Sequence, residues 1–121
     1  MIEIMNDFPE NVVGIKAKGR VTREDYEMIL IPKIERALQK HDKINCYYEL
    51  GSAFSGMDSG AMWEDTLVGL EHLSKWGKIA AVTDVSWIAH ELSAFRFLMP
   101  GKLRVFPTSE VQTARKWVSK T

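Results

Sequence analysis

The sequence has few of the features that mark secreted, membrane-spanning or nucleic-acid-binding proteins. Its single cysteine, Cys46, excludes an internal disulfide and fits a reducing cytoplasm. Sixteen basic and sixteen acidic side chains cancel, so a nucleic-acid partner is not expected. No charged and then apolar leader opens the chain, and no run of about 18 apolar residues is present to span a bilayer. We therefore expect a cytoplasmic protein that is neither secreted nor integral to a membrane.

Signatures of the common enzyme classes are missing as well. No glycine-rich loop ends in Lys-Ser or Lys-Thr, so ATP or GTP binding of the usual kind has no support. His90-Glu91 is followed by alanine where a zinc protease needs its second histidine. Residues 56–60 place a serine between glycines at the wrong spacing for a hydrolase nucleophile. Glu64 and Asp65 are helix neighbours that point about 100° apart, which favours a solvated face. We expect no catalytic residues, no cofactor and no metal site.

What remains is the composition of one ordinary domain, residues 1–121, with 45% hydrophobic residues to fill its core. Strand patterns run over Ile2–Met5, Asn11–Lys18, Lys43–Leu50, Lys78–Thr83 and Lys102–Phe106. Helix patterns run over Thr22–Lys40, Ser59–Trp76, Ser86–Met99 and Glu110–Lys120. Because strands and helices alternate after residue 10, we predict an α/β fold. It has a mixed, mostly parallel sheet of about five strands and about four helices.

Local signals mark where these elements begin and end. Thr22 has a carboxylate three positions on, which predicts a capping box at the first helix. Pro32 removes a backbone hydrogen bond and predicts a kink or break in that helix. Gly77 is expected to end the second helix in a left-handed conformation. Asp84 and Ser86 are alternative N-caps for the third helix.

The second and third helices carry more large apolar residues than one buried face needs. The second presents a broad apolar face, and on the third only His90, Ser93 and Arg96 clearly look outward. For any single ring, core packing is the simpler interpretation. The surplus nevertheless predicts an exposed surface or groove. Its candidate residues are Met62, Trp63, Leu67, Trp76, Trp87, Leu92, Phe95, Phe97 and Leu98.

Basic residues near the ends of these two helices suggest what such a surface would meet. Lys75 and Lys78 follow the second helix, and Arg96 and Lys102 lie around the end of the third. Cations beside an apolar surface fit lipid headgroups. The expected occupant is an apolar or lipid-like small molecule, the inner face of the membrane in a peripheral contact, or a second copy in a homodimer.

The stretch from Cys46 to Asp65 joins a strand to a helix through a loop rich in glycine and serine. Asp58-Ser59-Gly60 opens the helix, where free backbone N–H groups favour anions. These residues are a candidate phosphoacceptor or phosphate site. The alternative is that Asp58 or Ser59 only caps the helix.

This strand, loop and helix resemble the core of STAS domains, the anti-sigma factor antagonist fold. Over nearly its whole length the chain is similar to the SpoIIAA-like branch of that superfamily, on residues 7–13, 21–26, 60–65, 82–88 and 97–101. The resemblance implies the STAS arrangement, with the first strand at a sheet edge. The family signature is Asp-Ser-Ser-Gly with one phosphorylated serine, and here only Ser59 stands in that position. Related CRAL-TRIO-like folds hold lipidic ligands.

Three hypotheses follow from these patterns. The first is a non-enzymatic STAS-like regulatory module whose second and third helices bind an apolar ligand, a membrane or a twin subunit. The second is a phospho-switch acting on a protein partner through Ser59. The third is an unrecognised enzyme, which would need a pocket containing titratable groups with shifted pKa values.

Overall fold

The structure, a computed structural model, describes residues 1–71, 73–98 and 102–120. Within these ranges the side chains at positions 63, 66, 68–70, 73, 94, 95, 97 and 98 lie outside the description. Predictions that rest on His72, Met99 or Gly101 therefore fall outside the described residues.

The sheet has five strands in the order β1-β2-β4-β6-β7. The bounds are β1 Ile2–Met5, β2 Val12–Ala17, β4 Ile44–Leu50, β6 Trp76–Thr83 and β7 Leu103–Phe106. Strand β1 pairs with β2 in the antiparallel direction, and all the other neighbours are parallel. The prediction of a mostly parallel sheet with the first strand at an edge is confirmed.

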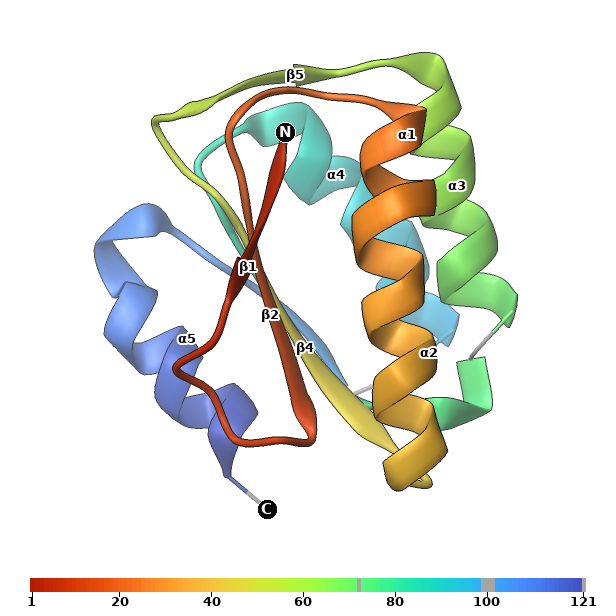
Figure 1. The fold of residues 1–121 in the computed structure, drawn as a ribbon. Coiled ribbons are helices and arrows are strands. Elements are labelled where there is room, and N and C mark those ends of the chain that lie inside the picture. The colour runs from red at the N-terminus through yellow and green to blue at the C-terminus, as the bar shows by residue number, and fades with distance from the viewer. Residues whose placement is uncertain (72, 99–101, 121) are drawn as a thin grey trace.

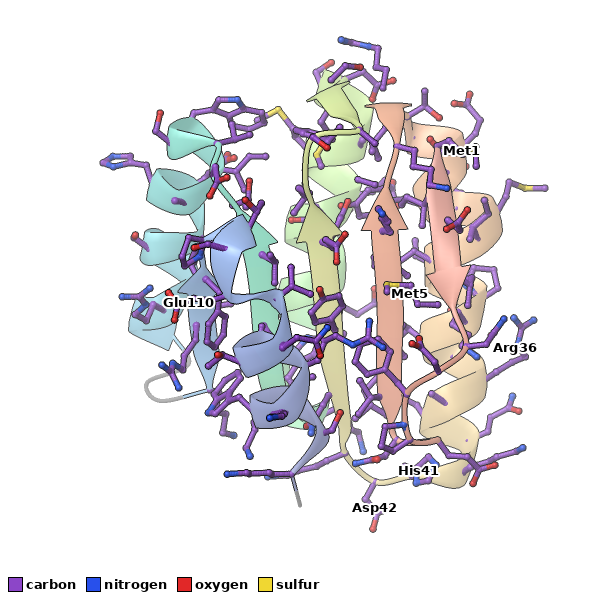
Figure 2. The ribbon with its side chains drawn as sticks, turned by 90° about the vertical axis from the view of Figure 1, so that its left-hand side faces the viewer. Met1, Met5, Arg36, His41, Asp42 and Glu110 are labelled. Atoms are coloured by element: carbon purple, nitrogen blue, oxygen red, sulfur yellow. The ribbon has the colours of Figure 1, made fainter. Side chains whose placement is uncertain are left out.

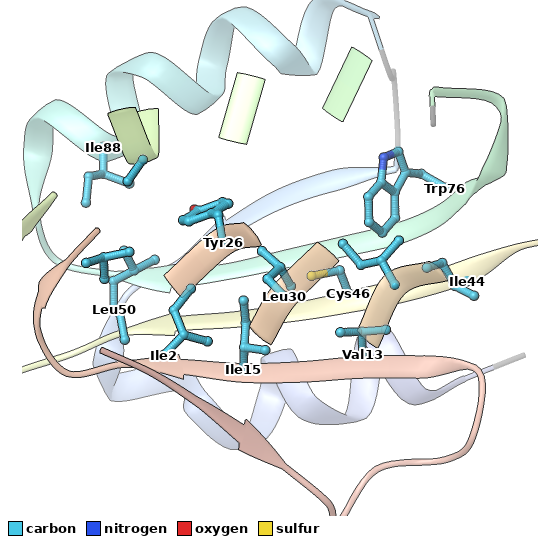
Figure 3. Close-up of a cluster of buried hydrophobic side chains, with 14 residues drawn as sticks. Ile2, Val13, Ile15, Tyr26, Leu30, Ile44, Cys46, Leu50, Trp76 and Ile88 are labelled. Atoms are coloured by element: carbon cyan, nitrogen blue, oxygen red, sulfur yellow. The ribbon is translucent and has the colours of Figure 1, made fainter. Parts of the chain in front are cut away.

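Helices cover both faces of this sheet (Figure 1). One face carries α1 Arg23–Asp25, the π-helical segment η1 Tyr26–Leu30, α2 Ile31–Lys40, α3 Ser59–Glu71 and α4 Ser86–Leu98; the other carries α5 Val111–Ser119. The 3-10 turns are η2 Leu73–Lys75 and η3 Thr108–Glu110. Two apolar clusters result, the larger beneath α2 to α4 (Figure 3) and the smaller beneath α5. Cys46 is buried in the larger one.

Helical structure continues through Pro32 without interruption. The capping box forms, with Thr22 N–H donating to Asp25 at 2.8 Å. At the junction Ile31 N–H bonds to the Tyr26 carbonyl, five positions back, and proline then falls in the first turn of α2. The π-helical segment before Pro32 changes the hydrogen-bond pattern at the point where the proline N–H is missing, and the helix does not break there.

The second helix ends earlier than predicted. Trp76 is the first residue of β6 and not the last turn of a helix, and Gly77 is in the strand without a positive φ. A Cβ on Gly77 would lie 2.2 Å from Oδ1 of Asn45. That oxygen accepts from Lys78 N–H at 2.7 Å, and Asn45 Nδ2 donates to the Val118 carbonyl at 2.7 Å. The glycine is needed for close approach, and the predicted helix end at Gly77 is wrong.

Two other local predictions are corrected. The glycine- and serine-rich loop contains a strand, β5 Phe54–Met57, which pairs in parallel with β3 Gly19–Val21 in a separate small sheet. Asp84 does not cap α4. Its carboxylate accepts hydrogen bonds from the backbone N–H and hydroxyl of Thr108. This contact links the end of β6 to the turn before α5.

Candidate functional site

A cavity of about 110 Å³ lies between the sheet and the helical layer formed by η1 and α2 to α4. Part of its surroundings appears in Figure 3, where β4 and β6 pass beneath the helices. Its walls are almost entirely apolar, and they come from eight elements. The lining residues are Tyr26, Leu30, Ile34, Cys46, Tyr48, Leu50, Met57, Asp65, Trp76, Ile79, Ala81, Ile88, Leu92 and Leu103.

The floor of the cavity follows from strand periodicity. Alternate residues of a strand point to the same face, so Cys46, Tyr48 and Leu50 of β4 all face the helices. The register pairs Tyr48 with Ala81 of β6. Cys46 and Ala81 are small side chains at central positions of the floor, and the hollow above them is left unfilled.

One wall carries a buried polar network. Tyr26, which is 0% exposed, donates its hydroxyl hydrogen to Oδ1 of Asp65 at 2.7 Å. The hydroxyl oxygens of Tyr26 and Tyr48 lie 3.0 Å apart. Because each phenol has one hydrogen, Tyr48 donates to Tyr26 and Tyr26 donates to the carboxylate. The network thus ends in a carboxylate that lines the cavity.

Burial governs the ionisation of this wall. It raises the pKa of Asp65; the Tyr26 hydrogen bond opposes that shift and the charge of Glu91 adds to it. Burial, and next the charge of Asp65, also raise the pKa of Tyr26 and of Tyr48, so both phenols stay neutral. Burial raises the pKa of the Cys46 thiol to about 12, which leaves it unreactive at neutral pH.

A smaller hollow of about 40 Å³ adjoins the cavity. Four residues line both spaces: Met57, Asp65, Ile88 and Leu92. Met62, Trp87 and Glu91 complete the smaller one, and Trp87 is 44% exposed. We call this hollow the mouth, because it shares lining residues with the cavity and is bordered by the exposed Trp87 at the start of α4.

Trp76 lines the cavity and carries a buried N–H that no described residue accepts. Trp76 is 3% exposed, and its buried Nε1 makes no hydrogen bond to a described residue. Figure 3 places Trp76 at the opposite end of the apolar cluster from Ile88, which borders the mouth. A buried donor without a partner costs roughly 1–3 kcal/mol.

The structure brings together part of the predicted apolar surface. Met62, Trp87 and Leu92 meet at the mouth, and Trp76 lines the inner cavity. Leu67 is 39% exposed on α3 and lines neither space. The side chains of four further predicted residues lie outside the description: Trp63, Phe95, Phe97 and Leu98.

The orientation of α3 differs from the prediction. Ala61 is fully buried and Asp65 faces the cavity, whereas Leu67 is exposed. Glu64 is also turned inward, with 12% exposure and an ion pair to Arg23 at 3.5 Å. The expectation that Glu64 and Asp65 form a solvated face is therefore wrong. The described residues by which α3 packs therefore include a small side chain, Ala61, and two carboxylates that have partners.

Asp58 acts as the cap of α3. Its Oδ1 accepts a hydrogen bond from Ala61 N–H at 2.7 Å. Ser59 is exposed beside it, and a Cβ on Gly60 would lie 3.0 Å from Cβ of Arg23. The capping interpretation of Asp58 is confirmed, and the hydroxyl of Ser59 is accessible from solvent.

The predicted basic residues do not form one group. Lys75 and Arg96 are exposed, and Lys102 is half-buried before β7. Lys78 lies under α5 on the opposite face of the sheet, where its Nζ donates to the carbonyls of Trp117 at 3.1 Å and Lys120 at 3.2 Å. Lys78 therefore does not face a surface made by α3 and α4.

Two further hollows have mixed polar and apolar linings. One groove lies between the β1–β2 turn and the end of α2, where Figure 2 shows Met5, Arg36 and His41.

Among the described residues, no group of three or more His, Cys, Asp or Glu side chains is placed to hold a metal ion. In the same part of the chain, no helix is both long and apolar enough to cross a bilayer.

Sequence reasoning missed the Tyr48–Tyr26–Asp65 network. A signal was present, because Tyr26 falls on the apolar stripe of the first helix and Tyr48 in a buried strand. A buried phenol needs a hydrogen-bond partner, and Asp65 is the carboxylate that the fold brings to them.

Comparisons with known proteins agree with this architecture. Residues 12–119 match the SpoIIAA-like family. A structure of an uncharacterised protein with a SpoIIAA-like fold from Shewanella loihica PV-4 is 24% identical, with a TM-score of 0.75 over 97% of this chain and 93% of that one. The anti-sigma factor antagonist SpoIIAA in its unphosphorylated form is 16% identical, with a TM-score of 0.60 over 97% and 98%. No sequence among the curated proteins matches.

Proposed function

Since the chain belongs to the SpoIIAA-like family, we propose that it is a non-enzymatic binding module whose cavity holds a small apolar ligand beneath α3 and α4. The observation that carries this proposal is the apolar space between the sheet and the helices. An engineered apolar cavity of about 150 Å³ stays dry and binds benzene, so a cavity of 110 Å³ is of the right order for a small hydrocarbon group.

The mouth gives such a ligand a route of entry. Trp87 is half-exposed at its rim, and Ile88 and Leu92 of α4 separate it from the inner space. Small rotations of these two side chains would admit a ligand without opening the sheet. Occupation of the cavity would stabilise the contact between α4 and the sheet, which is how binding at this site would be passed to a partner.

A titration with 1-hexanol tests the proposal. The wild type should show saturable binding, followed by calorimetry and by shifts of the Trp76 and Ile88 resonances. Ala81→Leu fills the cavity floor and should abolish binding, and Cys46→Leu serves if that variant does not fold. The control is Met28→Leu, at a position 75% exposed on η1, which should bind like the wild type. Absence of saturable binding to the folded wild type contradicts the proposal.

A membrane surface or a second copy of the chain are the other occupants the sequence suggests. Among the described residues, Trp87 on α4 and Leu67 on α3 are large apolar side chains that are exposed. Under this proposal the protein is cytoplasmic and meets the inner face of the membrane only peripherally. Co-sedimentation with liposomes that is lost in Trp87→Ala supports a membrane contact, and a concentration-dependent mass lost in the same variant supports a homodimer.

The second candidate function is a phospho-switch at Ser59. It is favoured by one observation: Ser59 is exposed in the first turn of α3, where free N–H groups and the helix dipole stabilise a phosphate. Mass spectrometry of protein from its own cells tests this idea. A Ser59 that is never modified, together with a Ser59→Asp variant that leaves partner binding unchanged, would remove it.

A further inference from the structure

The boundary between cavity and mouth is acidic. Asp65 lines both spaces, and Glu91 lines the mouth. Within the described part of the chain, neither carboxylate forms an ion pair with a lysine, an arginine or a histidine. Two carboxylates therefore stand at the entrance of an apolar cavity without a cation from the described residues.

One carboxylate oxygen of Asp65 is available to a ligand. Oδ1 accepts from Tyr26, and Oδ2 accepts no hydrogen bond from a described residue. A carboxylate that is partly removed from water and has only one donor gains most from a ligand that brings a positive charge and further N–H donors. The pKa of Asp65 is raised by burial and by the charge of Glu91, and no cation among the described residues lowers it.

The other walls of the mouth suit a cation as well. The Trp87 indole is 44% exposed there, and the face of an indole attracts ammonium groups. Met57 contributes a polarisable thioether. Ile88 and Leu92 also line the inner cavity, whose lining is apolar apart from Tyr26, Tyr48, Asp65 and the Trp76 indole, as far as the described residues go.

We propose that this site takes a small organic amine, with its ammonium group at Asp65 and Glu91 in the mouth and its hydrocarbon part in the cavity. The inference rests on the proposed function, because it specifies the polar end of the same apolar ligand. Cavity and mouth together have room for roughly six carbon atoms, judged against the apolar cavity of about 150 Å³ that binds benzene. A fatty acid of that length would place its carboxylate against two others.

Three probes of equal length test the head group: hexylammonium, 1-hexanol and hexanoate, titrated into the full chain at pH 7. The wild type should bind hexylammonium at least tenfold more tightly than 1-hexanol, and hexanoate least tightly. Asp65→Asn keeps an acceptor for Tyr26 but removes the charge, so it should weaken hexylammonium at least tenfold and leave 1-hexanol within twofold. Glu91→Gln should weaken hexylammonium about threefold.

The matched control is Glu71→Gln, which makes the same change of charge at an exposed position on α3 outside the mouth. It should leave all three affinities within twofold. If Asp65→Asn does not fold, Glu91→Gln decides the question, because Glu91 is exposed and its replacement leaves the buried network untouched.

The outcomes separate this inference from the proposed function. If 1-hexanol binds but hexylammonium binds no better, or if Glu71→Gln weakens hexylammonium as much as the mouth variants do, the amine assignment is overturned and the apolar cavity stands. Tightest binding of hexanoate overturns it too. If none of the three probes binds, the proposed function fails and the inference fails with it.

Discussion

Tyr26 donates its hydroxyl hydrogen to Oδ1 of Asp65 at 2.7 Å, across 39 positions of the sequence. The bond joins the π-helical segment η1 to α3 along one wall of the cavity, and Tyr48 adds β4 through its own hydroxyl. Three elements are thus tied together at the point where the cavity meets its mouth. The same three side chains are the only polar part of an otherwise apolar lining, apart from the indole nitrogen of Trp76, as far as the described residues go.

Loss of the Tyr26 hydroxyl should be costly. Tyr26→Phe leaves the partly buried Asp65 carboxylate without its donor, so we expect the free energy of unfolding to fall by about 1–3 kcal/mol. Tyr48→Phe removes only the outer, neutral hydrogen bond and should cost about 1 kcal/mol. Urea unfolding of both variants measures the difference. An equal or larger loss in Tyr48→Phe would contradict the order of donors inferred here.

The buried carboxylate predicts a pH dependence of stability. Because burial raises the folded-state pKa of Asp65, the folded protein binds more protons than the unfolded chain at pH values above the ordinary aspartate pKa of 3.8. The contribution of Asp65 to stability therefore falls as the pH rises from the ordinary aspartate pKa through the raised folded-state pKa. Asp65→Asn removes this effect. The melting temperature of the variant, measured relative to that of the wild type, should therefore increase from pH 4 to pH 7. A constant difference, or one that shrinks with pH, would be evidence against a raised pKa.

Two adjacent residues at the start of α3 have different roles: Asp58 caps the helix and Ser59 is exposed. Asp58→Ala removes the acceptor for Ala61 N–H and should destabilise the protein by about 1 kcal/mol. Ser59→Ala changes an exposed side chain and should stay within about 0.5 kcal/mol of the wild type. Thermal unfolding of the two variants side by side is the measurement. A larger effect at Ser59 would reverse the assignment of the cap.

Gly77 should tolerate no side chain. In Gly77→Ala the new Cβ would meet Asn45 Oδ1 and break its hydrogen bond to Lys78 N–H, so we expect a loss of about 2 kcal/mol or more. Gly51→Ala is the control, because the nearest atom to its Cβ would be 4.0 Å away. The double variant Gly77→Ala with Asn45→Ala should be less destabilised than the sum of the single changes. Simple additivity would show that the two residues are not in contact.

Sequence patterns predicted the elements well where each pattern has one physical cause. The capping box at Thr22, the buried strand through Ala81 and the place of the first strand at the edge follow from local hydrogen bonding, periodicity and family resemblance. Trp76 was misplaced because a large apolar residue after a helix fits either a last helical turn or the start of a buried strand. The choice depends on the pairing of Ile44 with Trp76, which is a tertiary contact.

The site was predicted only in part for a related reason. The aromatic surplus indicated an apolar space near α3 and α4, and Trp87 and Leu92 do border it. Counting large apolar residues gave α3 the wrong orientation, because Asp65 can turn inward only when Tyr26 is there to donate to it. That partner lies in another helix, so no pattern within α3 contains the information. β5 was missed because its Phe-Ser-Gly-Met sequence has no strand signal without β3 beside it.

Xenon binding tests the central claim most directly, since xenon enters small apolar cavities without needing a particular chemical group. In crystals pressurised with the gas, we predict one xenon atom in the space bounded by Leu30, Ala81 and Leu103, and none there in Ala81→Leu. A wild-type structure in which neighbouring side chains fill that space, with no xenon between the sheet and the helices, would contradict the account.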